Sequence, residues 1–430
     1  MYDLAIIGSG WAGSNAALTA KAKGLKVCII EKSLVGGTCL NRGCIPTKAL
    51  IHSAKIYVSL KKAGNFGVEL KGQAGLNFTA VQQRKEKVVE QLSRGMEFML
   101  KGIDFIKGQA EIISNKAIKV GNETIETKAI LIACGSRPAE LASFKFDGAR
   151  IISSDELINI KNIPSSLLIV GGGVIGCEFA SLFSDLGSNV AVVELMPQLL
   201  PGEDKEIAGK LFNIFTRKSI KVNLNTSVKA EETGAYELVL VCVGRRPDTS
   251  GLGLEKLGIK LEKGKVEVDE FLRTNIPGIY AAGDCTGKIM LAHFAAYQGN
   301  VAAENIADPD NPVKIDSDNV PGGIFTDPEI ASVGLTEEAA KAKGLPAKVN
   351  KFDFLGLGMA RILDETQGFI KIVSHDKTGA LLGAQIIGPR AVELIGVFSL
   401  AIRNKQTVAQ LKNAIFPHPS ISEAISEALK

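Results

Sequence analysis

The chain alternates between apolar strands and helix-length segments, and one such alternation occurs twice. Residues 3–31 begin with an apolar strand, continue through a glycine-rich turn and an Ala- and Leu-rich stretch, and end in a second apolar strand closed by a Glu. Residues 167–194 repeat this order. A strand, a helix-length segment and a second strand predict a βαβ unit with parallel strands. The repeat therefore predicts two parallel sheets, each built around one such unit.

Both repeats close on a similar segment but differ in what precedes it. The first reaches AILIACGSRP at residues 129–138, and the second reaches ELVLVCVGRRP at residues 237–247. In the first copy, residues 104–128 alternate between apolar and polar positions with turn residues between them, which predicts an antiparallel meander. The second copy has only residues 221–237 at this place. That length is too short for three strands, so we predict a meander reduced to a hairpin.

Further helices and a third domain follow from the same patterns. Helical periodicity covers residues 45–63 and 79–101, and residues 278–287 predict a strand and a turn before a helix at 291–307. From about residue 317, alternating strands are followed by helical patterns, which predicts an α+β domain. The fold class is therefore α/β, with two βαβ-based domains and a C-terminal α+β domain.

Composition and charge exclude several partners. The 430 residues are 46% hydrophobic and 22% charged, and the net charge of +4 is spread along the chain without a long basic run. Nucleic acids and anionic membranes are therefore poor candidates as partners. No apolar run is long enough to span a bilayer. A strand beginning near residue 2 leaves no room for a signal peptide, so we expect a cytoplasmic protein.

The first repeat carries a glycine motif that binds dinucleotides. Gly8, Gly10 and Gly13 form G-x-G-x-x-G directly after a strand and at the start of a helix. Glycines at these positions permit the tight turn, the approach of a pyrophosphate and the packing of helix on strand. Glu31, at the end of the next strand, is placed to accept hydrogen bonds from a ribose. Trp11 is bulky for this turn, and we expect it to point away from the phosphates.

The second repeat carries the same arrangement in Gly171, Gly173, Gly176 and Glu194. Both units are therefore expected to be Rossmann-like dinucleotide-binding domains. A Glu at the strand end favours an unphosphorylated ribose and repels a 2′-phosphate. No Arg follows Glu194 directly, since the next three residues are Leu, Met and Pro. The second nucleotide is accordingly expected to be NAD rather than NADP.

Two of the seven cysteines form the strongest local signal. Cys39 and Cys44 lie five positions apart in GGTCLNRGCIPTK, after a glycine pair and before a Pro. This spacing at a helix start is expected to lower a thiol pKa and to favour disulfide exchange. Metal binding is disfavoured because the chain has no second Cys/His pair at ligand spacing. The other cysteines are expected to be small buried hydrophobes: Cys28, Cys134, Cys177, Cys242 and Cys285.

One histidine near the C-terminus is a candidate acid–base group. His418 lies between two prolines, and Glu423 follows five residues later at a predicted helix start. A carboxylate that orients an imidazole raises its basicity. With a cysteine pair in the same chain, we interpret His418 and Glu423 as a catalytic pair. The remaining histidines are expected to be structural: His52, His293 and His375.

Together these motifs resemble a known family. The matching segments are GGTCLNRGCIPTK, AAGD (281–284), MLAH (290–293), TDPEIASVG (326–334) and HPSISE (418–423). They resemble the class I pyridine nucleotide–disulfide oxidoreductases over nearly the whole chain. Within that family, the sequence C-L-N-R-G-C-I-P and Glu194 are most similar to the dihydrolipoamide dehydrogenases, the E3 subunits of 2-oxo acid dehydrogenase complexes.

The resemblance implies cofactors, an assembly and roles for single residues. FAD would bind the first unit and NAD the second, in a homodimer built through the C-terminal domain. Cys39 would be the interchange thiol, and Cys44 would form the charge-transfer complex with the flavin. His418, reaching in from the other subunit, would be the base that Glu423 orients. Cofactor contacts are also implied for Lys48 paired with Glu178, for Asp284, for Leu291, Ala292 and His293, and for the turns at Gly135 and Gly244.

The same resemblance implies domain limits and a reaction. The expected segments are residues 1–145 (first part of the FAD domain), 146–268 (NAD domain), 269–316 (central part of the FAD domain) and 317–430 (dimerisation domain). The implied reaction is oxidation of protein-bound dihydrolipoyl groups by NAD⁺, with lipoyl-bearing proteins of 2-oxo acid dehydrogenase or glycine cleavage complexes as partners.

Two alternatives remain open, and two departures from the family pattern bear on them. The chain could instead reduce another disulfide with NAD(P)H, or it could be a catalytically weak flavoprotein scaffold. The shortened second meander is expected to reduce nicotinamide affinity or the stability of that domain. The turn Ala133-Cys134-Gly135 is a milder departure, because Cys replaces the family's Thr.

Overall fold

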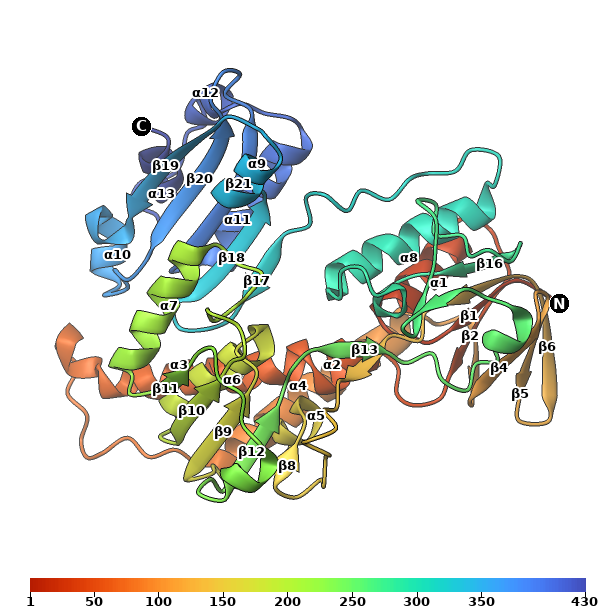
Figure 1. The fold of residues 1–430 in the computed structure, drawn as a ribbon, viewed down its shortest axis with the longest axis horizontal. Coiled ribbons are helices and arrows are strands. Elements are labelled where there is room, and N and C mark those ends of the chain that lie inside the picture. Colours follow the sequence, from red (N-terminus) through yellow and green to blue (C-terminus); the bar gives the residue numbers. More distant parts are fainter. The chain divides into compact units, whose positions relative to one another are not determined.

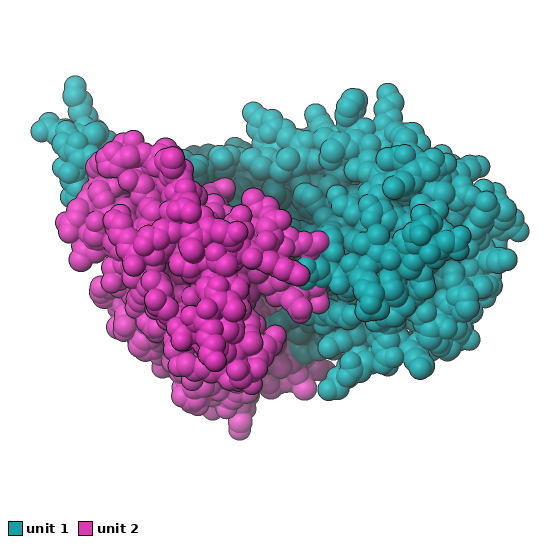
Figure 2. Space-filling model, turned by 90° about the horizontal axis from the view of Figure 1, so that it is seen from above, with its two compact units in different colours: residues 1–140, 153–162, 244–316 teal, residues 141–152, 163–243, 317–430 magenta.

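The computed structural model describes residues 1–430, which fall into two compact units. Each unit combines segments that are separated along the chain, and Figure 2 shows unit 1 in teal and unit 2 in magenta. Neither unit contains a helix that is both long enough and apolar enough to cross a membrane. Unit 1 comprises residues 1–140, 153–162 and 244–316, and unit 2 comprises residues 141–152, 163–243 and 317–430.

Unit 1 is built on a seven-stranded sheet in the order β3-β2-β1-β6-β5-β4, in which β16 also pairs with β6. Its parallel part consists of β3, β2, β1, β6 and β16. Strand β2 is buried along its whole length, as expected for a parallel strand covered on both faces. The strands span Tyr2–Ile7 (β1), Val27–Glu31 (β2), Asp104–Lys107 (β3), Ala110–Ser114 (β4), Ala117–Val120 (β5), Glu123–Ile132 (β6) and Ile279–Ala281 (β16).

The first βαβ unit and its meander are confirmed. Strands β1 and β2 are parallel and flank helix α1 (Trp11–Ala22). Strands β4, β5 and β6 pair in antiparallel order. Strand β3, at the start of the segment expected to form the meander, instead pairs in parallel with β2. Alternate residues of β1 belong to different apolar clusters, so the sheet separates two cores.

The helices of unit 1 form where the sequence predicts them. Helix α8 (Ala292–Ala307) packs closely on α1 (Figure 1), since a Cβ added to Gly299 would lie 2.1 Å from the carbonyl oxygen of Ala12. The two helices expected before the meander are α3 (Cys44–Lys61) and α4 (Phe78–Met99). Shorter elements of unit 1 are α2 (Gly37–Arg42), η1 (Ala63–Phe66), β7 (Ser136–Pro138), α5 (Ser154–Leu157), β13 (Arg245–Pro247), η3 (Glu255–Leu257), β14 (Leu261–Glu262), β15 (Lys265–Val266) and η4 (Asp284–Thr286).

The second βαβ unit forms a parallel sheet in unit 2, in the order β11-β10-β9-β12-β8. Helix α6 (Val174–Asp185) connects β9 to β10, as the repeat predicts. Helix α7 (Lys205–Arg217) follows β10 and precedes β11. The strands span Ile151–Ile152 (β8), Ser166–Val170 (β9), Asn189–Val193 (β10), Lys221–Asn223 (β11) and Leu238–Val241 (β12).

The prediction of a hairpin between β11 and β12 is wrong. This segment holds only one short 3-10 turn, η2 (Ala230–Thr233). Its backbone bonds to another part of the sheet edge, because the amides of Asn225 and Thr226 donate to the carbonyls of Met196 and Glu194 at 3.2 and 3.0 Å. Arg150 also donates to carbonyls of this segment. Its backbone groups therefore find partners outside the segment, and no strand pair forms.

The C-terminal part of unit 2 is an antiparallel sheet in the order β17-β18-β21-β20-β19, which confirms the α+β prediction. Helix α11 (Ala391–Arg403) and helix α13 (Glu423–Ala428) contribute to its apolar core. The strands span Gly322–Ile324 (β17), Glu329–Gly334 (β18), Ala347–Asp353 (β19), Phe369–His375 (β20) and Leu381–Gly388 (β21). Smaller elements are α9 (Glu337–Ala342), η5 (Phe354–Gly356), α10 (Gly358–Ile362) and α12 (Val408–Lys412).

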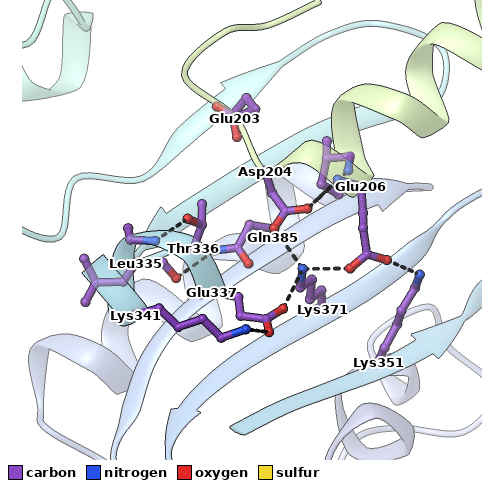
Figure 3. Close-up of polar contacts among 12 residues, drawn as sticks. Glu203, Asp204, Glu206, Leu335, Thr336, Glu337, Lys341, Lys351, Lys371 and Gln385 are labelled. Atoms are coloured by element: carbon purple, nitrogen blue, oxygen red, sulfur yellow. Dashed lines mark hydrogen bonds and ion pairs between the residues drawn. The ribbon is translucent and has the colours of Figure 1, made fainter. Parts of the chain in front are cut away.

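A buried ion cluster joins helix α7 to this sheet (Figure 3). The Lys371 side chain on β20 is 1% exposed, and its Nζ lies 2.9 Å from Oδ2 of Asp204 and 2.8 Å from Oε1 of Glu206. Oε2 of Glu337 is 3.5 Å from the same nitrogen. Asp204 also caps α7 by accepting from the backbone N–H of Glu206 at 2.9 Å. A buried lysine is thus neutralised by carboxylates from two different elements.

Candidate active site

The two motif cysteines lie side by side in unit 1. Cys39 belongs to the short helix α2, and Cys44 is the first residue of α3. Both are free thiols, and they are hydrogen-bonded to each other. Gly43 permits this approach, because a Cβ there would lie 3.2 Å from Cα of Cys39. The spacing C-x-x-x-x-C with a glycine before the second Cys therefore produces a pair able to form a disulfide.

The predicted lowering of a thiol pKa is wrong for Cys39. Its hydrogen bond with Cys44, together with burial, raises the pKa of Cys39 well above the ordinary value. The protonated form is favoured because Cys39 shares its proton with a neighbouring sulfur and is shielded from water. Cys44 is the first residue of α3, and Cys39 is the third residue of the short helix α2. A reduced pair therefore keeps its proton until a base removes it.

The cysteine helix contacts the first dinucleotide turn. A Cβ added to Gly37 would lie 2.8 Å from Cα of Gly10, so only a glycine allows this approach. Gly10 is the N-cap of α1, and Gly13 follows within that helix. The thiol pair and the dinucleotide turn are consequently parts of one site.

The carboxylate of Glu31 organises that turn. Gly8 follows β1 directly, and Glu31 is the last residue of β2. Oε2 of Glu31 accepts from the backbone N–H of Ser9 at 2.8 Å and from its hydroxyl at 2.9 Å. Oε1 accepts from the backbone N–H of Ser33 at 2.8 Å. The carboxylate is buried and fixed, with further lone pairs available to a ribose.

A cavity opens beside this carboxylate. Gly8, Glu31, Gly108, Cys134 and Asp248 are among the residues that line it. Its rim carries an ion pair in which Nζ of Lys32 lies 2.7 Å from Oδ2 of Asp248. A strand-end acid and a glycine turn line this cavity, and the turn leads into the N-terminus of α1; this arrangement fits the adenosine diphosphate half of a dinucleotide.

One orphaned donor supports a cofactor in this unit. Nε2 of Gln298 is buried without a hydrogen-bond partner in the protein. The Gln298 amide lies beside the turn before η4, since its Oε1 accepts from the backbone N–H of Gly283 at 2.8 Å. Buried donors are rarely left unpaired in proteins. The residues present therefore fit FAD, whose phosphate and ribityl oxygens are acceptors.

The second glycine turn reproduces the first. Gly171 follows β9, Gly173 caps α6 and Gly176 lies within that helix. Oε2 of Glu194 accepts from the backbone N–H of Gly172 at 2.6 Å, and Oε1 accepts from that of Met196 at 2.7 Å. The acid is 8% exposed. Glu194 and Glu31 thus hold equivalent turns by equivalent hydrogen bonds.

The sequence missed a network around Asp284. The Ser136 hydroxyl donates to Oδ2 of Asp284 at 2.5 Å, and Nε of Arg245 donates to that hydroxyl at 2.8 Å. Burial lowers the pKa of Arg245, and the carboxylates of Asp155 and Asp284 partly offset this. Ser136 and Arg245 occupy the paired strands β7 and β13, which are the SRP and RRP endings of the two repeats. The similar endings of the two repeats could have predicted this network, because equivalent segments of a repeat often pair with each other.

The other predicted contact residues lie at turns and helix starts. Leu291 is the N-cap of α8, with Ala292 and His293 as its first residues. Gly135 and Gly244 both have positive φ, at +74° and +115°, in the turns that follow β6 and β12. Lys48 is half-buried in α3, and Glu178 is 4% exposed in α6. Oε1 of Glu178 accepts from the backbone N–H of Phe325 at 2.9 Å, and its pairing with Lys48 stays a prediction.

His418 and Glu423 are brought together in unit 2. Nδ1 of His418 lies 2.8 Å from Oε1 of Glu423, and Oε2 accepts from the backbone N–H of Ser420 at 2.8 Å. The hydrogen bond from His418 and that from Ser420 lower the pKa of Glu423. The His418 side chain is 83% exposed. The imidazole is thus oriented by a carboxylate and presents its other nitrogen to the surroundings.

Comparisons with known proteins agree with this geometry. The family model described as pyridine nucleotide-disulphide oxidoreductase matches residues 2–299, and the dimerisation domain of the same family matches residues 320–429. The dihydrolipoyl dehydrogenase of Chlamydia muridarum is 41% identical over 448 residues, which cover 99% of this chain and 96% of that protein. A dihydrolipoyl dehydrogenase of Bacillus subtilis is 39% identical over 461 residues, covering 99% and 97%.

Solved structures give the same result. LpdA from Mycobacterium tuberculosis superposes with a TM-score of 0.91 at 30% identity, covering 99% of this chain and 98% of that one. The HOCl-induced flavoprotein disulfide reductase RclA from Escherichia coli superposes with a TM-score of 0.89 at 32% identity, covering 100% and 99%. With its paired thiols and two dinucleotide turns, the chain is a flavoprotein disulfide oxidoreductase and belongs to the pyridine nucleotide–disulphide oxidoreductase family.

Proposed function

We propose that this enzyme oxidises protein-bound dihydrolipoyl groups with NAD⁺, as a dihydrolipoyl dehydrogenase. The observation that carries the proposal is the pair of hydrogen-bonded thiols, Cys39 and Cys44, against the first dinucleotide turn. The full-length similarity to dihydrolipoyl dehydrogenases supports the choice of substrate. The overall reaction is dihydrolipoyl group + NAD⁺ → lipoyl group + NADH + H⁺.

The thiol half of the reaction is an exchange between two disulfides. A thiolate of the substrate attacks the sulfur of Cys39 in the oxidised enzyme, and Cys44 leaves as a thiolate. The second substrate thiol then attacks the first, which releases the lipoyl disulfide and leaves Cys39 reduced. Each attack needs a deprotonated thiol. The substrate thiols must therefore lose their protons, and Cys39, whose pKa is raised in the reduced pair, takes up a proton when it leaves, so a group that accepts and returns protons is needed at the site.

His418 supplies that base in our proposal. Glu423 binds Nδ1 of the imidazole, so Nε2 is the nitrogen that accepts a proton. Its exposed position on the surface of unit 2 suits a side chain that completes the site of a second copy. We therefore propose that His418 of the partner subunit deprotonates the substrate dithiol, in a homodimer formed through the matched dimerisation domain.

FAD and NAD are the cofactors of this chemistry. When bound, FAD would supply the two-electron chemistry that links the cysteine pair to nicotinamide. Gly8, Gly10, Gly13 and Glu31 would hold the flavin nucleotide. Gly171, Gly173, Gly176 and Glu194 would hold NAD, and the Glu194 carboxylate disfavours a 2′-phosphate.

We propose that the physiological substrate is a lipoyl arm carried by another protein. Lipoyl-bearing subunits of 2-oxo acid dehydrogenase or glycine cleavage complexes are the partners that this implies. We also propose the domain limits 1–145, 146–268, 269–316 and 317–430 and a cytoplasmic location. Hydrogen–deuterium exchange with a lipoylated domain would test the partnership, because protection should appear near Cys39.

A second candidate function rests on one observation. The Escherichia coli flavoprotein disulfide reductase RclA is about as similar in fold to this chain as LpdA from Mycobacterium tuberculosis, with TM-scores of 0.89 and 0.91. The enzyme could therefore work toward reduction of another disulfide. The test is a comparison of NADH oxidation with lipoamide, glutathione disulfide and coenzyme A disulfide at equal concentrations.

For that comparison we expect lipoamide to be preferred in kcat/KM by about a hundredfold, the range that pocket contacts supply. A preference for either of the other disulfides would replace the first proposal with the second. A folded, yellow protein that reduces none of them would favour a weakly catalytic flavoprotein.

A further inference from the structure

Two cysteines outside the redox motif lie at neighbouring strand ends in unit 1. Strands β6 and β16 are parallel, with Ile132 paired to Ala281. Cys134 follows the end of β6 by two residues, and Cys285 follows the end of β16 by four. Because parallel strands end at the same edge of a sheet, both cysteines come to one edge. This edge also carries the first dinucleotide turn.

Their side chains pack in the same apolar cluster. The Cys285 thiol is completely buried and donates toward the carbonyl oxygens of Ile132 at 3.3 Å and Ala282 at 3.2 Å. Cys134 packs against the same apolar cluster, where the neighbouring Cys285 thiol and burial raise the pKa of Cys134. The pair thus resembles Cys39 and Cys44 in being two reduced thiols that lie close together.

Both cysteines are adjacent to the flavin-binding elements. Cys134 lines the cavity beside Glu31, and a Cβ on Gly8 would lie 3.4 Å from its Cα. Cys285 directly follows Asp284, whose carboxylate accepts from Ser136. A disulfide holds its sulfurs about 2.05 Å apart, closer than hydrogen-bonded thiols. Closing it would draw the turn after β6 and the η4 turn toward each other.

We propose that Cys134 and Cys285 form a second dithiol–disulfide couple, which a small organic disulfide oxidises in the flavin-free protein and which then opposes FAD binding. This inference goes beyond the lipoamide reaction and does not use Cys39 or Cys44. A dinucleotide bound in the cavity that Cys134 lines would cover this side chain, so we expect the holoenzyme to be protected.

The step proceeds by two exchanges. Cys134 is half-buried and first loses its proton to the solvent; its thiolate then attacks R–S–S–R, forming a mixed disulfide and releasing one R–S⁻, which takes up a proton. The Cys285 thiolate then attacks the Cys134 sulfur and releases the second R–S⁻. The two cysteine protons neutralise the released thiolates, so the balance is two Cys–SH + R–S–S–R → Cys134–S–S–Cys285 + 2 R–SH. The enzyme loses two electrons and the small disulfide gains them.

The test uses the full-length Cys39→Ser/Cys44→Ser protein, in which the redox motif cannot react. Samples stripped of flavin and samples saturated with FAD are incubated with hydroxyethyl disulfide. Peptide mass spectrometry then looks for a link between Cys134 and Cys285, and quenching of flavin fluorescence measures FAD binding. We expect the link in the flavin-free sample alone. We also expect about tenfold weaker FAD binding, the effect of losing one good hydrogen bond, with recovery after a reductant.

Controls assign the effect to this pair. Added to the Cys39→Ser/Cys44→Ser protein, Cys285→Ala should abolish both the link and the loss of FAD affinity. Cys28→Ala, at a buried position in β2, should change neither of these results. Absence of the link in the flavin-free sample overturns the proposal, as does a linked protein that binds FAD normally. The comparison of flavin-free and FAD-saturated samples uses a protein in which Cys134 and Cys285 are unchanged. Its result is therefore valid even if a control variant fails to fold.

Discussion

The Nδ1 atom of His418 lies 2.8 Å from Oε1 of Glu423, at the start of the last helix of the chain. This contact fixes which imidazole nitrogen carries the hydrogen directed at the carboxylate and leaves Nε2 to exchange protons. Glu423 is held in turn by the backbone of Ser420 at 2.8 Å. The base of the proposed reaction is therefore oriented before any substrate arrives.

Replacing the base should slow the thiol half of the reaction. We expect His418→Gln to lower kcat with dihydrolipoamide by roughly 100-fold, the usual contribution of a general base. Oxidation of NADH with an artificial acceptor that takes electrons directly from the flavin should be little affected, because this half of the reaction needs no base for a thiol. Stopped-flow measurement of each half-reaction separates the two, and an unchanged dithiol half would show that another group is the base.

Removing the orienting carboxylate should have a smaller effect. Glu423→Ala leaves the imidazole in place but releases Nδ1, and a loss of about tenfold is expected from the loss of a partner that orients a His. The Glu423 pKa is lowered by His418 and Ser420, so the carboxylate stays ionised across the neutral range. The pH profile of kcat should shift in Glu423→Ala and not in Glu427→Ala, a matched change one turn later in α13.

Cys44→Ser should abolish dithiol oxidation while FAD stays bound. Serine preserves the size of the side chain but cannot form the disulfide with Cys39. Turnover with dihydrolipoamide and the flavin content of the purified protein are the two measurements. Cys28→Ala, at a buried position without a role in the site, is the control. Full activity in Cys44→Ser would remove the thiol pair from the mechanism.

Glu194 should control the choice of nicotinamide nucleotide. In Glu194→Gln, the side-chain oxygen can still accept from Gly172, but the charge that repels a 2′-phosphate is lost. We expect the KM for NAD⁺ to rise by about tenfold, the effect of losing one hydrogen bond to a charged group. The ratio of the KM for NADP⁺ to the KM for NAD⁺ should become smaller. An unchanged ratio of the two KM values would show that Glu194 does not face the ribose.

The cluster around Lys371 should be required for the stability of unit 2 (Figure 3). Burial disfavours the charged amine, but hydrogen bonds to Glu206 and Asp204 outweigh it and raise the pKa of Lys371. Lys371→Met leaves the buried Asp204 carboxylate without its cation, which should cost about 3 kcal/mol in the free energy of unfolding by urea. Adding Asp204→Asn, which keeps the helix cap, should recover part of this loss. A Lys371→Met protein as stable as the parent would contradict the assignment.

The same cluster predicts a response to acid. Hydrogen bonds from Lys351 and Lys371 lower the pKa of Glu206 below its ordinary 4.5. A lowered carboxyl pKa adds stability above the ordinary value, and this stability is lost as the pH falls through the lowered value. At pH values below about 4.5, the urea concentration at the unfolding midpoint should therefore decrease as the pH is lowered. The decrease should be smaller in Glu206→Gln, which has no carboxyl to titrate at this position.

Local patterns were sufficient to predict the dinucleotide turns. The glycines and the strand-end acids Glu31 and Glu194 are short-range features, and both βαβ units have the predicted order. The residues 224–237 were predicted wrongly because their hydrogen-bond partners, such as Met196 and Arg150, lie far away in sequence. Propensity within the segment carries no information on such partners.

Properties that depend on a neighbouring side chain also could not be predicted from the sequence. The raised pKa of Cys39 comes first from its contact with Cys44, which outweighs any effect of helix position. The contact between Cys134 and Cys285 requires β6 and β16 to be adjacent, and no local pattern states that. The same holds for Arg245 and Ser136, which meet only when β7 pairs with β13.

The most direct test of the proposed function is the initial rate of NAD⁺ reduction by dihydrolipoamide with the purified protein, with NADP⁺ in a parallel reaction. We predict rapid formation of NADH from NAD⁺ and little or no reduction of NADP⁺. No reduction of either nucleotide by a folded protein that carries FAD would contradict the assignment as a dihydrolipoyl dehydrogenase.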